Sequence, residues 1–230
     1  MRRLSVLLVV LLFVPVSPAR FADGYRELFN GKDLDDWVAE GDKEYEQDGK
    51  ELPVWVAKDG LLTCKVNTHQ SYGFLRFTKQ EFADFRLHAE YRMTPRANEK
   101  ETRCNSGIGI RTVPFDPKQS DKTRPSRAAY EIQLLDDADT KPDKHSTASL
   151  YNYVAPSAQA AKPAPEWNVI EIECVGPHIT ITLNDKEVIN VDQSEIKEIK
   201  DKPLKGYICL QNHGGKIDFK NIKIREIKPK

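Results

Sequence analysis

The stretch Phe85-Arg86-Leu87-His88-Ala89-Glu90-Tyr91-Arg92-Met93 alternates apolar and polar side chains over nine residues. A period of two is typical of a β-strand that buries one face and exposes the other. Shorter runs of strand character lie on both sides of it, at residues 61–66, 74–77, 107–112, 130–135, 167–175, 178–183, 186–191, 206–211 and 217–227. Ten or more strands without intervening helices predict an all-β fold, a two-layer antiparallel sandwich of the jelly-roll kind.

The segments between these runs predict turns and one long loop. Asn184-Asp185 separates two runs and favours a tight hairpin turn. Only residues 194–200 have a pattern that suits a short helix. Polar stretches at residues 40–51, 114–127 and 136–165 interrupt the strands. The last is 30 residues long, and loops of such length often bind ligands or close over sites. We therefore expect a single domain with a site on one face or rim of the sandwich.

Charge and composition exclude several classes of partner. Of the 230 residues, 35 are Lys or Arg and 35 are Asp or Glu, with the two signs interspersed. A nucleic-acid binder usually carries a basic stripe, and a polybasic membrane-docking protein carries a run of positive charge. This sequence has neither. With 39% hydrophobic residues it suits a soluble globular domain.

The N-terminus has the pattern of a secretory signal. Arg2-Arg3 precedes an apolar run at residues 4–14, and small residues follow at Ser17 and Ala19. The run is too short to span a bilayer, which takes about 20 apolar residues. We expect cleavage near Ala19, no stable membrane insertion, and a mature domain of residues 20–230 in the periplasm or outside the cell.

Export changes the interpretation of the four cysteines, Cys64, Cys104, Cys174 and Cys209. In an oxidising compartment they allow two disulfides with three connectivities. Two of them lie inside apolar strand patterns, where a buried free thiol is the alternative. The sequence leaves both readings open, and it leaves the oligomeric state open as well.

Short motifs follow one another in a fixed order along the mature chain. They are Leu-Phe-Asn-Gly-Lys-Asp-Leu-Asp-Asp-Trp at 28–37, Asn-Ser-Gly-Ile-Gly-Ile-Arg at 105–111, Tyr-Glu-Ile-Gln-Leu-Leu-Asp at 130–136, Glu-Trp-Asn at 166–168, Leu-Gln-Asn-His-Gly at 210–214 and Phe-Lys-Asn-Ile at 219–222. Taken together, the sequence resembles the 3-keto-disaccharide hydrolase domain family over roughly residues 25–228. Pro165 and Asp185 stand where the family usually has glycine.

The resemblance implies a concanavalin A-like jelly roll and cleavage of glycosides already oxidised to a ketone at sugar C3. Such a ketone acidifies the proton on C2, so a base can remove it, the C1 substituent can leave and water can add. This route needs a base near C2 and a donor or cation at the C3 oxygen.

Strand parity selects the candidates for these roles. Glu131 and Gln133 are two apart and share one face of a strand, so Glu131 is the candidate base and Gln133 a sugar-binding partner. A solvated carboxylate on the sheet face is the alternative for Glu131. Arg111 follows Gly107 and Gly109 at the same parity and is the candidate for holding the enediolate, or else an ion-pair partner of Glu131. His213 is the candidate proton shuttle.

The remaining candidates would bind the sugar. Gln211 shares the parity of His213, Asn105 precedes the arginine strand, and Tyr151 and Trp167 offer flat apolar rings for sugar faces. Core packing is the alternative for Trp167. Asp136 has opposite parity to Glu131, so it joins the site only through a bulge or if the strand has already ended, and otherwise serves a cap or a turn.

No cofactor is established by any motif. A divalent ion on Glu131, His145 or His213 fits the residue types without being required by their spacing. The sequence predicts a carbohydrate-cleaving enzyme acting on 3-keto-glycosides or 3-keto-disaccharides. A non-catalytic carbohydrate-binding sandwich is the alternative, and a protein-interaction domain is a weaker third.

Overall fold

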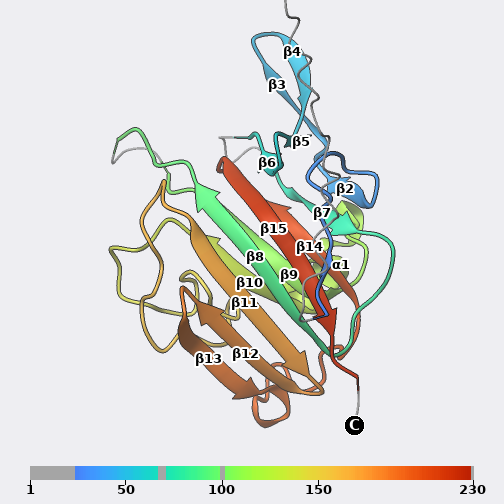
Figure 1. The fold of residues 1–230 in the computed structure, drawn as a ribbon, viewed down its shortest axis with the longest axis vertical. Helices are drawn as coiled ribbons and strands as arrows, with labels where there is room; N and C mark the ends of the chain where they lie inside the picture. Colours follow the sequence, from blue (N-terminus) through green and yellow to red (C-terminus); the bar gives the residue numbers. More distant parts are fainter. Residues whose placement is uncertain (1–23, 67–70, 99–101, 229–230) are drawn as a thin grey trace, which may run out of the picture.

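Two antiparallel sheets packed face to face form the body of the molecule (Figure 1). The computed structural model describes residues 24–66, 71–98 and 102–228. The larger sheet has the order β13-β12-β11-β8-β15-β6-β5, with β1 paired to β15, and the smaller has the order β10-β9-β14-β7-β2. The predicted two-layer all-β sandwich is therefore confirmed. The predicted signal at residues 1–19 lies outside the described residues.

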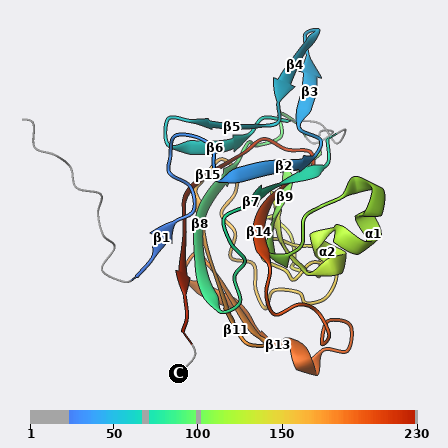
Figure 2. The ribbon, with the colours of Figure 1, turned by 90° about the vertical axis from the view of Figure 1, so that its right-hand side faces the viewer.

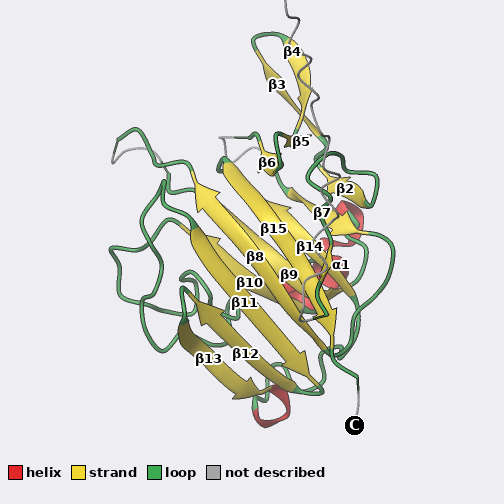
Figure 3. Cartoon of the chain, in the orientation of Figure 1, coloured by secondary structure: helices red, strands yellow, loops and turns green. Residues whose placement is uncertain are grey.

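The strands of the larger sheet are β1 (Arg26–Glu27), β5 (Trp55–Lys58), β6 (Leu61–Cys64), β8 (Phe85–Met93), β11 (Asn168–Val175), β12 (His178–Leu183), β13 (Lys186–Asp192) and β15 (Ile217–Glu226). Those of the smaller are β2 (Trp37–Gly41), β7 (Gly73–Phe77), β9 (Asn105–Thr112), β10 (Tyr130–Leu135) and β14 (Tyr207–Asn212). A hairpin of β3 (Glu44–Gln47) and β4 (Lys50–Pro53) projects from one end (Figures 1 and 3).

The core lies between the two sheets. Along β8, every second residue from Phe85 to Met93 is buried, as the alternation predicts. From the smaller sheet, Ile108, Ile132 and Leu210 face this layer. Their neighbours in sequence therefore point to the outer face of the smaller sheet, which is where a site can form.

Short helices cover that outer face. They are η1 (Pro117–Gln119), α1 (Ser120–Thr123) and α2 (Pro125–Ala128). Figure 2 shows α1 and α2 beside β9 and β14, on the side away from the larger sheet. The sequence predicts only a polar loop at residues 114–127, because four-residue helices are too short to produce a 3.6-residue pattern.

The hairpin turn predicted at Asn184-Asp185 is confirmed, whereas two other local predictions are wrong. Asn184 and Asp185 both have left-handed backbone angles, as a type I′ hairpin turn between β12 and β13 requires. The prediction that the polar stretch at 40–51 interrupts the strands is wrong, because it contains the end of β2, all of β3 and the start of β4. Of the helix at 194–200 only a 3₁₀ turn forms, η2 (Gln193–Glu195).

The four cysteines are free and buried. Burial also raises the pKa of each thiol, which keeps them protonated and unreactive. The free-thiol alternative is the one the structure has. Within the described residues, no helix is long and apolar enough to cross a membrane.

Candidate active site

A cavity of about 140 Å³ opens on the outer face of the smaller sheet. It brings together five of the nine predicted site residues, Glu131, Gln133, Tyr151, Gln211 and His213. Three further side chains complete its walls: Tyr72, Arg124 and Ser126. The first five come from β10, the long loop, β14 and the residue that follows it, and the other three come from the segment before β7 and from the helical cover.

A glycine on β9, the neighbour of β10 in the sheet, makes room for Glu131. In the register of β10 with β9, Glu131 lies opposite Gly109 and Gln133 opposite Gly107. A Cβ on Gly107 would lie 3.1 Å from Cγ of Glu131, closer than most real contacts of this kind. Because Gly107 and Gly109 of β9 have no side chains, the Glu131 side chain can extend across β9 and hydrogen-bond Gln211 on β14. Glycine at 107 is thus needed for space.

Among the described residues that line the cavity, Glu131 is the one carboxylic acid. The residue is only 4% exposed. Burial raises its pKa to about 7, against the opposing effects of side-chain hydrogen bonds from Gln211 and Ser126 and of the positive charge of Arg124. A carboxylate with a pKa near neutrality is suited to take and return a proton at physiological pH. The alternative of a solvated sheet-face carboxylate is wrong.

Arg124 supplies the cation of the cavity. It lies between α1 and α2, and its Nε and Nη2 donate to Ser120 Oγ at 3.1 and 2.9 Å. Its guanidinium lies 5.0 Å from the centre of the Tyr72 ring, over the ring face. Both contacts hold the charge near Glu131.

His213 and the amides form the polar remainder of the wall. Nδ1 of His213 lies 3.2 Å from Nδ2 of Asn105, and its ring meets the edge of Tyr72 at 5.0 Å between centroids. Asn105 therefore lies behind the cavity, in contact with His213, but it is not among the lining residues, so its binding to sugar hydroxyls stays a prediction. Oε1 of Gln133 and of Gln211 are buried without a hydrogen-bond partner in the structure. Such acceptors suit the hydroxyl groups of a sugar.

The long loop reaches the cavity through Tyr151. Its backbone N donates to the carbonyl of Glu131 at 2.9 Å, so the loop runs along the edge of β10. The Tyr151 ring packs against His145 at 5.2 Å between centroids, and His145 is exposed at the rim. The expectation that this loop builds part of a site agrees with this placement.

Arg111 lies elsewhere, and its predicted face is wrong. Its φ of 54° is left-handed, and the register of β9 with β14 shifts beside it. The alternation of faces therefore fails at this position, and the side chain is fully buried away from the cavity. Its Nε and Nη2 donate to the carbonyl of Ala83, and Nη2 lies 3.7 Å from Asp84 Oδ1. Arg111 thus pairs with Asp84 and not with Glu131.

We expect Arg111→Ala to destabilise the fold. The change leaves the Asp84 charge and the Ala83 carbonyl without their buried partner, and breaking a buried pair typically costs about 3–5 kcal/mol. Urea unfolding should show a loss of that order. Arg92→Ala, which removes a partly exposed ion pair to Asp218, should cost at most about 1 kcal/mol. Equal stabilities of the two variants would contradict this role for Arg111.

Two other predicted site residues also lie outside the cavity. Asp136 begins the long loop, where its Oδ1 accepts from the backbone N of Ala164 and its carbonyl accepts from Arg103. It has the turn role that the sequence left open. Trp167 precedes β11 in the other sheet, where Arg92 and Lys220 lie over its ring at 4.8 and 4.0 Å. It is neither in the core nor in the cavity.

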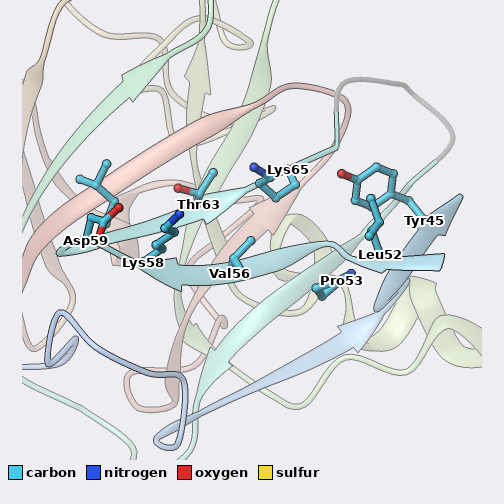
Figure 4. A pocket seen from close by; sticks show the side chains of 9 residues that line it. Tyr45, Leu52, Pro53, Val56, Lys58, Asp59, Thr63 and Lys65 are labelled. Carbon is cyan, nitrogen blue, oxygen red and sulfur yellow. The ribbon is translucent and has the colours of Figure 1, made fainter. Parts of the chain in front are cut away.

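A metal-ligand cluster or a second hollow would be an alternative site. Across residues 24–66, 71–98 and 102–228, no group of three or more His, Cys, Asp or Glu is placed to hold a metal ion. A hollow of about 340 Å³ lies between the β3–β4 hairpin and strands β5 and β6 (Figure 4). Its charged residues, Lys58, Asp59 and Lys65, are all exposed. It lacks the buried acid that distinguishes the Glu131 cavity.

Comparisons with known proteins agree with the fold and point to carbohydrates. The sequence profile of the 3-keto-alpha-glucoside-1,2-lyase-like domain matches residues 24–225. A 3-keto-disaccharide hydrolase of Bacteroides thetaiotaomicron is 24% identical over 242 aligned positions, which cover 89% of this chain and 79% of that protein.

Two solved structures share the sandwich. A Parabacteroides distasonis protein named as a candidate glycosyl hydrolase superposes with a TM-score of 0.68 at 22% identity, covering 90% of this chain and 95% of that one. The carbohydrate-binding module CBM66 of Bacillus subtilis gives a TM-score of 0.54 at 11% identity, covering 83% and 96%. At these identities the likeness concerns the fold alone.

Proposed function

The chain belongs to the family of 3-keto-alpha-glucoside-1,2-lyase-like domains, and from this premise we propose that it cleaves glycosides that carry a ketone at sugar C3. The observation that carries the proposal is the buried acid of the cavity, Glu131, with its pKa near 7. A C3 ketone makes the neighbouring C2 proton removable by such a base, whereas an unoxidised sugar offers no comparably acidic proton.

The proposed first step is proton transfer from C2 to Glu131. The electron pair of the C–H bond forms a C2–C3 double bond, and the ketone oxygen becomes an enediolate oxygen. This oxygen needs a positive partner in a site screened from water. Arg124 is that partner in our proposal, because its guanidinium is the charge that acts on Glu131 across the cavity.

In the second step the enediolate expels the group at C1. The C3 ketone re-forms, a C1–C2 double bond appears, and the C1–O bond breaks while the leaving oxygen takes a proton. His213 and Tyr72 line the wall and are the candidate donors. Burial raises the pKa of Tyr72, so its hydroxyl is protonated. Water then adds to C1 and a proton returns to C2, which completes a net hydrolysis.

The remaining wall would fix the orientation of the sugar. Gln133 and Gln211 line the cavity with amide oxygens that have no partner, and these would accept hydrogen bonds from the ring hydroxyls. A volume of about 140 Å³ lies well below the 300 Å³ or more of typical drug-sized pockets. It suits one sugar ring, so the C1 substituent would lie at the rim, where Tyr151 and His145 present their rings. We also propose that residues 1–19 direct export, so that the substrate is met outside the cytoplasm.

We expect the purified domain to release nitrophenol from p-nitrophenyl 3-keto-glucoside and none from the unoxidised glucoside. Elimination depends on the acidity that the ketone gives to the C2 proton. The measurement is absorbance of nitrophenolate, with and without added divalent ions to test for a metal requirement. Release from both substrates would indicate an ordinary glycosidase mechanism, and release from neither would contradict the proposal.

A non-catalytic sugar-binding module remains the second candidate, favoured by the sandwich fold shared with CBM66. Binding without chemistry, however, has no use for a buried carboxyl group with a raised pKa, which costs folding free energy when ionised. The keto-glucoside assay separates the two candidates, because a binding module would retain sugar affinity and release no product.

A further inference from the structure

Lys202 makes an unusual set of contacts beneath the active-site cover. It lies in the segment between η2 and β14 and is half-buried. Its Nζ donates to the carbonyls of Ser126 at 3.2 Å and Arg127 at 3.0 Å, and to the carbonyl of Ala129. Among the ion pairs of the described residues, none includes Lys202. Its ammonium group is therefore bound by backbone oxygens in place of a carboxylate.

These carbonyls belong to the C-terminal end of α2, which has four residues. A single helical turn has few internal hydrogen bonds and is not stable alone. A cation at the carbonyl end satisfies the unpaired oxygens and opposes the helix dipole. Lys202 thus supplies from outside the helix the stabilisation that α2 is too short to provide.

Two tyrosines fix the ammonium group in place. The rings of Tyr153 and Tyr130 lie 4.4 and 5.3 Å from Nζ, in the range of cation–π attraction. The Tyr153 hydroxyl also donates to the carbonyl of Ser126 at 3.0 Å. Gln193 holds the backbone of Lys202 by a 2.9 Å hydrogen bond to its carbonyl. Residues of β10, the long loop and η2 therefore hold Lys202 in place.

Ser126 links this cluster to the cavity. Its carbonyl accepts from Lys202 and Tyr153, while its side chain lines the cavity and hydrogen-bonds the carboxyl group of Glu131. That hydrogen bond favours the ionised form of Glu131. Fixing the backbone of Ser126 fixes the hydroxyl that tunes the base.

We propose that Lys202 is a positioning residue for the reaction, which holds α2 so that Ser126 can hydrogen-bond Glu131. The effect of Lys202 on the reaction rate rests on the proposed function, whereas its effect on the titration of Glu131 does not depend on that function. Loss of Lys202 should act on the acid through α2, whose Ser126 hydrogen-bonds the Glu131 carboxyl group.

The test measures the titration of Glu131 by ¹³C NMR of labelled glutamate, with Glu131→Gln to assign the signal. The Ser126 hydroxyl hydrogen-bonds the ionised carboxylate more strongly than the neutral acid, so Ser126→Ala should move the Glu131 midpoint upward by about 0.5 to 1 pH unit. Lys202→Met should move it in the same direction. Lys202→Arg, which keeps the charge and the donors, should restore the wild-type midpoint.

A double variant shows whether Lys202 acts on Glu131 by way of Ser126. Ser126→Ala with Lys202→Met should shift Glu131 no further than Ser126→Ala alone, because coupled residues are not additive. Lys200→Met, an exposed lysine of the same segment, is the matched control and should change nothing. If Lys202→Met does not fold, Lys202→Gln is measured by the same criterion.

An unchanged Glu131 midpoint in a folded Lys202 variant would overturn the proposal and leave Lys202 with a structural role only. The NMR readout does not depend on turnover. Failure of the keto-glucoside assay with a shifted midpoint would therefore count against the proposed function and not against this inference.

Discussion

Glu131→Gln is expected to reduce turnover of 3-keto-glycosides by about 10³-fold or more. General base catalysis typically contributes 10²- to 10⁴-fold, and among the described residues no other carboxylate lines the cavity. The amide keeps the size of the side chain and the hydrogen-bonding shape of the acid but cannot accept the C2 proton. The measurement is kcat/KM on p-nitrophenyl 3-keto-glucoside, together with exchange of the C2 hydrogen in deuterated water.

The loss of turnover in Glu131→Gln must be separated from unfolding of the variant. The dependence of folding stability on the ionisation of Glu131 predicts that the variant stays folded. The folded-state pKa of Glu131 is about 7, above its ordinary value of 4.5. The folded protein therefore binds the proton more tightly, and Glu131 lowers stability as the pH rises from about 4.5 to 7. Above pH 7 its ionisation costs roughly 3 kcal/mol, an upper figure from the change in pKa. Glu131→Gln should accordingly be at least as stable as wild type at pH 8.

The dependence of kcat/KM on pH gives a second test of Glu131 as the base. Because the base must be ionised, kcat/KM of the wild type should rise through a midpoint near pH 7 and then level off. Glu171→Gln, which removes a carboxylate on the outer face of the other sheet, is the control and should retain the wild-type profile. Wild-type rates in Glu131→Gln would rule out Glu131 as the base.

Strand parity was sufficient for part of this site. Glu131 and Gln133 share a face because β10 is regular, and their partners Ile132 and Leu134 are in the core as alternation requires. Parity failed at Arg111, where one left-handed residue reverses the direction of the side chain. Such a backbone angle has no signal in the pattern of apolar and polar residues, and glycines nearby suggested regular spacing instead.

Sheet membership was also beyond the sequence. Trp167 adjoins a strand as clear in pattern as β10, yet β11 pairs with β8 in the other sheet. Alternation predicts that a strand is half-buried but does not assign its neighbours. Arg124, between α1 and α2, and Ser126, in α2, were missed because both helices have only four residues. The Arg124-Pro125 dipeptide, with proline at a favoured first helical position, was the one available signal.

Arg124→Met is expected to lower kcat/KM by about 10²- to 10³-fold at pH 7.5, the range found when a donor to a developing oxyanion is removed. The variant keeps an unbranched side chain against the Tyr72 ring but has no charge for the enediolate. Two effects should add. The transition state loses its cation, and the pKa of Glu131 rises because Arg124 no longer lowers it.

The two effects are distinguishable by pH. The upward movement of the Glu131 midpoint can be overcome by raising the pH, whereas the lost stabilisation of the enediolate persists on the plateau. We therefore expect a plateau that stays well below that of the wild type. The matched control is Arg127→Met, three residues further on, whose exposed side chain pairs with Asp121 at 3.3 Å outside the cavity. Its profile should be that of the wild type. If Arg124→Met recovered the full wild-type plateau at high pH, Arg124 would act only on the pKa of Glu131. The enediolate would then need another positive partner, and His213 in the same wall would be the next candidate.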